Sequence, residues 1–218
     1  MKNRTGQTRP SLRRPAGLEP ATYGFEVRRS IQLSYGRTND QYNGKAQRKG
    51  RAGPVIAYRS VTVTTRLVSP RDPDATRLLA LLTEEIRQMY ADRGEDGSGG
   101  FEIEDAEQPG SAFIVAYVDG EAIGCGALRP YDTEAGEVKR MFVLPEYRGR
   151  GIAMTILAAI ELEAVRKGYR VMRLETGDRQ PNAVRVYERA GYRRSAPYGV
   201  YVNWVGSLCF IKDLATPS

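Results

Sequence analysis

The sequence predicts an α/β fold of the mixed, α+β type, in which helices pack on one central mixed sheet. Alternating β-branched segments favour strands, and apolar residues repeated every three or four positions favour helices. Along the chain these segments follow the order strand, helix, three strands, helix, strand, helix, two strands. A doubly wound nucleotide-binding fold would alternate strand and helix throughout, so this order argues against one.

The first predicted elements lie between residues 61 and 100. Val61–Val68 is β-branched and alternating, which indicates a strand. Asp72 and Pro73 then supply a helix cap and a proline suited to the first helical position. The apolar side chains of this helix fall on one face: Leu78, Leu82, Ile86 and Met89. The Gly/Asp-rich stretch Gly94–Gly100 predicts a loop after it.

The later elements are marked by turn residues. Asp119 and Gly120 form a strong hairpin signal between two strands, while Gly168 and Gly191 each follow a predicted helix. The predicted strands are Ala112–Val118, Ala122–Leu128, Glu137–Leu144, Val171–Glu175, Tyr192–Arg194 and Leu208–Lys212. The predicted helices are Gly151–Lys167 and Pro181–Ala190.

Composition excludes several kinds of chemistry. The sequence has no histidine, which rules out Ser-His-Asp and Cys-His catalysis and an HExxH zinc site. Two cysteines, Cys125 and Cys209, are too few for a zinc cluster, so we expect no metal and two packed thiols. No stretch approaches about 18 consecutive apolar residues, and the N-terminus lacks the apolar part of a secretory signal. We therefore expect a cytoplasmic protein with no membrane partner.

Charge divides the chain near Ser60. Residues 1–60 hold 13 Lys/Arg against 3 Asp/Glu, whereas residues 61–218 hold 20 against 23. Only 18 of the first 60 residues are apolar, and this composition favours disorder. Three explanations stay open: a nucleic-acid-binding arm, a targeting peptide, or a segment foreign to the native protein. The last is favoured, because Arg14 to Arg37 resembles a peptide that recurs where bacterial reading frames have been extended upstream. Nucleic acid is thus an unlikely partner.

The most informative segment is Glu137–Ala153, in which a predicted strand enters the turn Arg148–Gly151 and the turn opens a helix. The first amide groups of a helix have no internal partner and, with the helix dipole, form an anion site. A pyrophosphate is the natural ligand. Neither the Rossmann GxGxxG pattern nor a Walker loop is matched. Taken alone, such a turn is more often purely structural, with two solvated arginines.

Two motifs together resemble a known family. Residues 148–153 fit the [Gln/Arg]-x-x-Gly-x-[Gly/Ala] signature of the GNAT superfamily of acyl-CoA N-acyltransferases. Residues 174–192 resemble the second element of that family, with Asn182, Tyr187 and Gly191 in the typical pattern. The resemblance covers residues 61–214 and leaves residues 1–60 as an extension and residues 215–218 as a tail. It implies the GNAT fold, a mostly antiparallel sheet of about seven strands with a splayed central strand pair, flanked by helices.

The resemblance also implies an enzyme that transfers an acetyl group from acetyl-CoA to a primary amine through a tetrahedral intermediate. The backbone of the central strand would bind the pantetheine arm, the turn would hold the pyrophosphate, and the next helix would add a contact. The cofactor-binding residues implied are Met141, Phe142, Val143, Arg148, Gly149, Arg150, Gly151, Ile152, Ala153 and Asn182.

Two residues are implied as catalytic, Tyr187 and Glu137. Tyr187 would protonate the leaving thiolate, although its position on an apolar helix face also suits a packing role. Glu137 lies eleven residues before Arg148, a spacing at which some members carry their general base. The alternatives are that Glu137 is a strand-end charge paired with Lys139 or Arg140, and that water is the base.

The acceptor stays open at this stage. A small amine or amino acid is preferred over a protein amine, and the acidic balance of residues 61–218 weakly favours a cationic one. Four aromatic residues either line the acceptor pocket or lie on the surface: Tyr131, Tyr198, Tyr201 and Trp204. The sequence leaves open whether the protein forms a homodimer. It also leaves open two other functions, a non-catalytic acyl-CoA sensor and a nucleic-acid-associated protein guided by the basic extension.

Overall fold

The structure, a computed structural model, describes residues 62–214, so the predictions for the extension 1–60 and the tail 215–218 lie outside the described residues. The strands are β1 (Val63–Val68), β2 (Ala112–Val118), β3 (Glu121–Pro130), β4 (Ala135–Val143), β5 (Val171–Gly177), β6 (Arg193–Arg194) and β7 (Ser207–Asp213). The α-helices are α1 (Pro73–Met89), α2 (Ile152–Arg166) and α3 (Pro181–Arg189).

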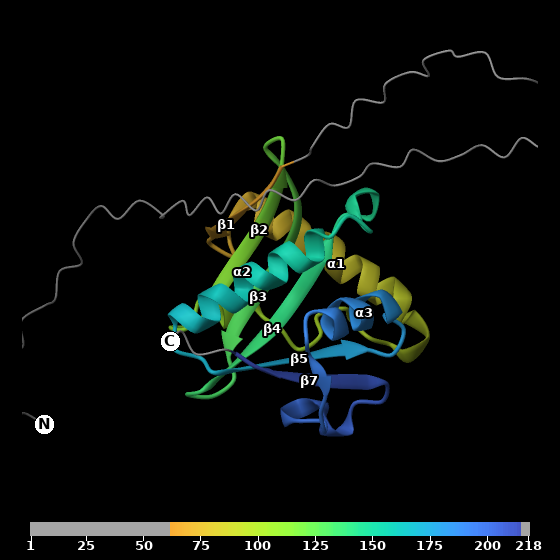
Figure 1. The fold of residues 1–218 in the computed structure, drawn as a ribbon. Helices are drawn as coiled ribbons and strands as arrows, with labels where there is room; N and C mark the ends of the chain where they lie inside the picture. The colour runs from red at the N-terminus through yellow and green to blue at the C-terminus, as the bar shows by residue number, and fades with distance from the viewer. Residues whose placement is uncertain (1–61, 215–218) are drawn as a thin grey trace, which may run out of the picture.

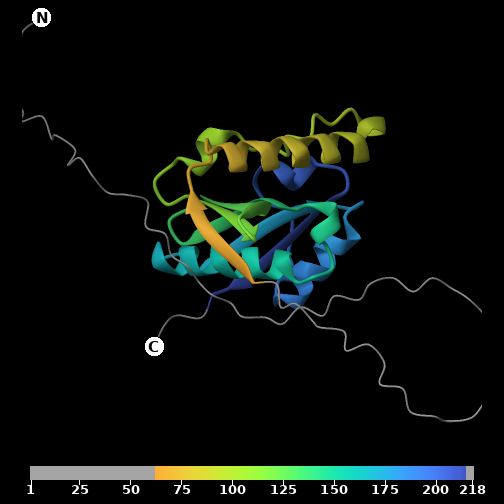
Figure 2. The same cartoon turned by 90° about the horizontal axis from the view of Figure 1, so that it is seen from above.

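All seven strands form one sheet in the order β1-β2-β3-β4-β5-β7-β6 (Figure 1). β4 and β5 pair in parallel and the other neighbours are antiparallel, so the predicted mixed, mostly antiparallel sheet is confirmed. Figure 2 shows α1 on one face of the sheet, with α2 and α3 on the other. The 3₁₀ turn Gly199–Asn203 lies on the same side as α1.

Local signals in the sequence fix the start of α1 and the first hairpin. The Asp72 carboxylate accepts a hydrogen bond from the Asp74 amide at 2.9 Å, and Pro73 begins the helix. Between β2 and β3, Asp119 and Gly120 both have positive φ, at 50° and 85°. A two-residue turn of this kind matches the twist of an antiparallel pair, which is why the Asp-Gly prediction holds.

The core lies between α1 and α2, where the middle of the sheet is covered on both faces. β2 is buried at every position, as a strand covered on both sides must be. α2 contributes a buried face made of Ile152, Ile156, Leu157, Ile160 and Ala164. Cys125 and Cys209 are free and buried, as predicted for packed thiols. Within the described range, none of the helices combines the length and the apolarity that crossing a membrane requires.

A β-bulge in β4 opens the sheet. The pairing of β3 with β4 shifts between Cys125 and Ala127, and Arg140 opposite this step has a φ of 56°. The extra residue bends β4 and adds twist. β4 therefore pairs with β5 only over the first half of each strand, up to Val138 and Leu174. Beyond these residues the two strands diverge, which is the splayed pair that the resemblance implied.

Candidate active site

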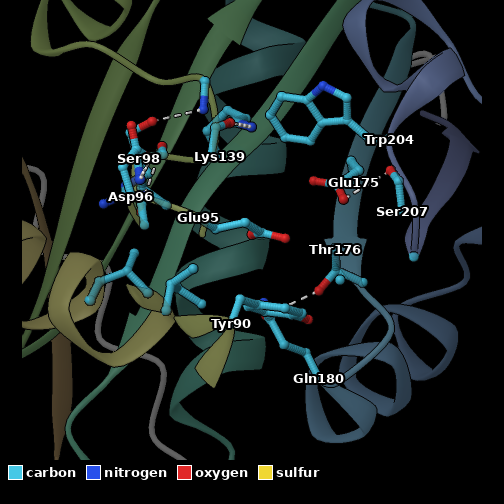
Figure 3. A pocket seen from close by; sticks show the side chains of 18 of the residues that line it. Tyr90, Glu95, Asp96, Ser98, Lys139, Glu175, Thr176, Gln180, Trp204 and Ser207 are labelled. Carbon is cyan, nitrogen blue, oxygen red and sulfur yellow. Dashed lines mark hydrogen bonds between the residues drawn. The ribbon is translucent and has the colours of Figure 1, made fainter. Parts of the chain in front are cut away.

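A cavity of about 770 Å³ opens where β4 and β5 diverge. Its walls come from α1, the loop Gly94–Gly100, the second halves of β4 and β5, Tyr187 of α3 and its N-cap residue Gln180, and residues 203–207. Figure 3 shows side chains from these separate segments around one space, with Trp204 on one wall and Tyr90 on another. Because α1 and α3 lie on opposite faces of the sheet and both contribute to the lining, the cavity extends through the opening between β4 and β5.

Tyr187 lines this cavity from α3. Its ring is 6% exposed and packs edge-on against Tyr192, with the ring centroids 6.0 Å apart. Burial raises the pKa of the Tyr187 phenol above its usual range, and the charge of Glu175 adds to the rise. Its hydroxyl makes no hydrogen bond to any residue that the structure describes. Tyr187 is therefore a neutral phenol that is free to donate a proton into the cavity.

Glu175 also lines the cavity, and the sequence analysis gave it no role. It is half-buried near the end of β5, where its carboxylate accepts a hydrogen bond from the Ser207 hydroxyl at 2.9 Å. Burial raises the pKa of Glu175, while the Ser207 hydrogen bond opposes the rise. The signal available in the sequence was an acidic residue inside a strand, Val171–Gly177. Glu175 lies on the half-buried face of that strand, opposite the fully buried face.

Glu137 is not among the residues that line the cavity. It is 1% exposed, and its carboxylate is bound from both sides. Arg129 Nε donates to one oxygen at 2.7 Å, while the hydroxyls of Tyr198 and Tyr201 donate to the other at 3.0 and 2.9 Å. The alternative of an exposed charge paired with Lys139 or Arg140 is wrong, because Glu137 is buried and its ion-pair partner is Arg129.

Two basic residues of β4 line the cavity but are held by loop carbonyls. Lys139 Nζ donates to the Gly99 carbonyl at 2.9 Å and to the Tyr201 hydroxyl at 2.7 Å. Burial lowers the pKa of Lys139. The Arg140 guanidinium donates to the carbonyls of Gly97 and Ser98 at 2.9 and 3.0 Å. These contacts fix the loop Gly94–Gly100 against the sheet.

The turn before α2 has the geometry of an anion site. Gly149 and Gly151 have φ values of 74° and 79°, which favour glycine, and Gly151 occupies the N-cap of α2. Among the described residues, no side chain caps α2, and its first turn holds no acidic residue. The first amides of α2 therefore have no side-chain partner, which is the arrangement that an anion site requires.

The two arginines of this turn differ. Arg148 is bound within the protein, because its Nη2 pairs with Glu85 at 2.7 Å and its Nε donates to the Val143 carbonyl at 2.8 Å. Arg150 lies over the Tyr147 ring, 5.5 Å from its centroid, and makes no ion pair with the described residues. The backbone amides and Arg150 are thus freer to hold a phosphate than Arg148.

The remaining residues predicted to bind the cofactor lie in different environments. Met141 lines the cavity together with Tyr187, whereas the side chains of Phe142 and Val143 are buried in the core. Asn182 is exposed outside the cavity lining, and its side-chain oxygen accepts a hydrogen bond from Arg185 at 3.5 Å. Within residues 62–214 no cluster of His, Cys, Asp and Glu is arranged to hold a metal.

Among the aromatic residues, Trp204 lines the cavity, whereas Tyr198 and Tyr201 are buried around Glu137. Tyr131 is 40% exposed and packs edge-on against Tyr198. Of these four aromatic residues, Trp204 therefore borders the cavity, while Tyr198 and Tyr201 are interior and Tyr131 lies at the surface.

A splayed parallel strand pair beside an uncapped helix N-terminus is the arrangement that the sequence motifs implied for an acyl-CoA N-acyltransferase. The sequence profile of the Acetyltransferase (GNAT) family matches residues 76–192, which include both strands, the turn and Tyr187. The chain belongs to this family of acetyltransferases, as the sequence motifs predicted.

Individual relatives agree with this assignment. An "IAA acetyltransferase" of Azospirillum brasilense is 33% identical over 64% of this chain and 90% of its own length. The uncharacterized N-acetyltransferase YsnE of Bacillus subtilis is 29% identical over 66% of this chain and 96% of its own. A crystal structure from Klebsiella pneumoniae, named as an acyl-CoA N-acyltransferase, is 27% identical with a TM-score of 0.58. That alignment covers 70% of this chain and 98% of the Klebsiella protein.

Proposed function

We propose that the protein transfers the acetyl group of acetyl-CoA to a primary amine of a small molecule. The observation that carries this proposal is the cavity at the β4–β5 opening, which holds the unpartnered hydroxyl of Tyr187 within electrostatic reach of Glu175. Acetylation of an amine needs a proton acceptor for the ammonium and a proton donor for the departing thiolate. Both kinds of group line this one space.

The residues present fit acetyl-CoA, which supplies the acetyl group as an activated thioester. The N-terminal amides of α2 suit the pyrophosphate, because they have no capping side chain and Arg150 lies next to them. Beyond Val138, the edge of β4 that faces β5 has no strand partner, so its backbone is available to the amide groups of the pantetheine arm. A backbone amide near Phe142 would polarise the acetyl carbonyl.

Glu175 is the better candidate for the general base, and Glu137 is the weaker one. The acceptor ammonium gives a proton to the base, and the neutral amine then forms a C–N bond to the acetyl carbon. As the C–S bond breaks, the thiolate takes a proton from Tyr187, and the second proton of the attacking nitrogen restores the Tyr187 phenol. A base for this sequence must reach the cavity, which Glu175 lines, whereas Arg129 and two tyrosines occupy Glu137. A raised carboxylate pKa also suits a base that works near neutral pH.

A panel of primary amines tests the proposed function. Thiol release from acetyl-CoA should rise above the rate without acceptor for at least one small amine, and the product should gain one acetyl group by mass. The Tyr187→Phe variant should lose this amine-dependent release. A protein that binds acetyl-CoA but releases thiol with none of the amines would instead be the non-catalytic sensor.

Gly151→Val should weaken acetyl-CoA binding by about tenfold or more. The valine Cβ and its methyl groups would stand where the backbone must approach the pyrophosphate, and a φ of 79° is strained for any residue but glycine. Calorimetric titration measures the affinity. Gly168→Val is the matched control, because Gly168 follows α2 at its other end with a φ of 88° and also has open space around it. Equal affinities for the two variants would place the cofactor elsewhere.

A further inference from the structure

We infer that the acceptor is a short diamine, whose reacting nitrogen meets Glu175 and whose second, ammonium nitrogen meets Glu95. The inference rests on the proposed function, because it names the substrate class of the same cavity. It follows from the charges that face the cavity, from what already binds each of them, and from one buried polar group that lacks a partner.

Glu95 is one of three carboxylates that line the cavity, and of the other two, Asp96 accepts a hydrogen bond from the Ser98 amide and Glu175 from the Ser207 hydroxyl. Glu95 is an exposed residue of the loop Gly94–Gly100, and it makes no hydrogen bond or ion pair with the described residues. Figure 3 shows its side chain extending into the middle of the cavity, toward the strand that carries Glu175 and Thr176. Burial raises the pKa of Glu175, and the negative charge of Glu95 adds to this rise. The two carboxylates therefore act on one space.

The cations of the cavity wall offset these carboxylates only in part. The charge of Lys139 opposes the rise in the pKa of Glu175, but Lys139 is bound to the Gly99 carbonyl and the Tyr201 hydroxyl, and Arg140 is bound to loop carbonyls. Arg93 pairs with Asp178, at 2.9 Å. The space between Glu95 and Glu175 thus carries negative charge that an acceptor with two ammonium groups would complement.

Ion pairs made by the residues just before Glu95 fix the start of the loop that carries it. Besides the Arg93–Asp178 pair, Arg179 pairs with Asp92 at 2.6 Å, and the Arg179 amide donates to the Tyr90 hydroxyl at 3.1 Å. These contacts join the end of α1 to the turn after β5, the strand that carries Glu175. Each exposed ion pair contributes little alone, but together they hold the two carboxylate-bearing segments in one arrangement.

Tyr187 is the independent sign of a ligand. Its hydroxyl is unpartnered although the residue is 6% exposed, and it lines the same cavity as the two carboxylates. The hydroxyl is open to the cavity and is not enclosed by protein, so a ligand atom that reaches it can take up its hydrogen bond. Trp204 and Tyr90 add aromatic walls, which suit the methylene chain of a diamine and its cationic end.

Three acceptors of equal chain length test the inference: butane-1,4-diamine, butylamine and 4-aminobutanoate. Each has one reacting amine and four carbons, and they differ at the far end, which carries a positive charge, no charge or a negative charge. We expect kcat/KM from thiol release to be about tenfold higher for the diamine than for butylamine, and lowest for the amino acid. Equilibrium binding of the three compounds to the CoA-saturated protein should follow the same order.

Glu95→Gln should reduce the diamine-to-butylamine ratio to about one, because it removes the charge that meets the second ammonium. Glu188→Gln is the control, since Glu188 is exposed on α3 outside the cavity lining, and the ratio should keep its wild-type value. A wild-type ratio near one, or a ratio that Glu95→Gln leaves unchanged, overturns the inference but not the proposed function. Diamine binding that is selective and depends on Glu95, with no thiol release from any amine, supports the inference and overturns the proposed reaction.

Discussion

Replacing Tyr187 by phenylalanine should lower kcat about 10²-fold while acetyl-CoA affinity changes little. The substitution keeps the ring that packs against Tyr192 and removes only the hydroxyl that faces the cavity. A lost general acid costs about 10² to 10⁴ in rate, and it acts mainly in the transition state rather than in binding. Steady-state kinetics and calorimetric titration measure the two quantities.

Tyr192→Phe is the matched control for this substitution. It removes a buried hydroxyl from the neighbouring ring, and Tyr192 does not line the cavity. Its hydroxyl has no hydrogen-bond partner among the described residues, so the substitution should leave kcat unchanged and should not lower stability. The Tyr187→Phe defect should also shrink with an acyl donor whose thiol is more acidic, since that thiolate needs less help. Near-normal turnover of Tyr187→Phe would leave solvent as the proton donor.

Replacing Glu175 by glutamine should lower kcat about 10²-fold and remove the acidic limb of the pH–rate profile. The base must be ionised to work, so activity should fall as pH drops through the pKa of Glu175. Because burial raises that pKa, this limb should lie above 4.5, the ordinary value for a glutamate. Glutamine has nearly the same shape but cannot take the proton. The measurement is kcat against pH for the wild type and the variant.

Glu137→Gln separates the two candidate bases. Glu137 and Arg129 form a buried ion pair, and breaking such a pair by removing one charge costs about 3–5 kcal/mol. We therefore expect lower stability in a denaturant titration, with the acidic limb retained in the folded variant. A folded Glu137→Gln enzyme that lacks the limb, together with a Glu175→Gln enzyme that keeps it, would assign the base to Glu137.

The sequence predicted those features that depend on neighbouring residues. Asp72 and Pro73 mark the start of α1, Asp119 and Gly120 mark the hairpin, and Gly151 marks the open end of α2. Each of these signals acts within a few residues of its effect. Local chemistry was therefore sufficient for the helices, most strands and the uncapped start of α2.

The environment of Glu137 was not predictable in the same way. Tyr198 and Tyr201 reach its carboxylate from 61 and 64 residues further along the chain, after β7 has inserted between β5 and β6. The bulge at Arg140 was missed as well, since a left-handed arginine has no marker comparable to glycine. Strand order and bulges depend on tertiary packing, and they decide which carboxylate faces the cavity.

The buried carboxylate of Glu137 has a consequence for how this enzyme can change over evolution. Arg129 binds Glu137 and also the carbonyl of Gly100 at 3.2 Å, while Tyr201 binds the same carboxylate three residues before Trp204. Two borders of the cavity, the loop Gly94–Gly100 and residues 203–207, are thereby connected to one interior charge. Substitutions of side chains that face the cavity from these segments can change which acceptor fits, while the hydrogen bonds to Glu137 remain. Selection on substrate range can therefore proceed at Glu95 and Trp204 without eroding the fold.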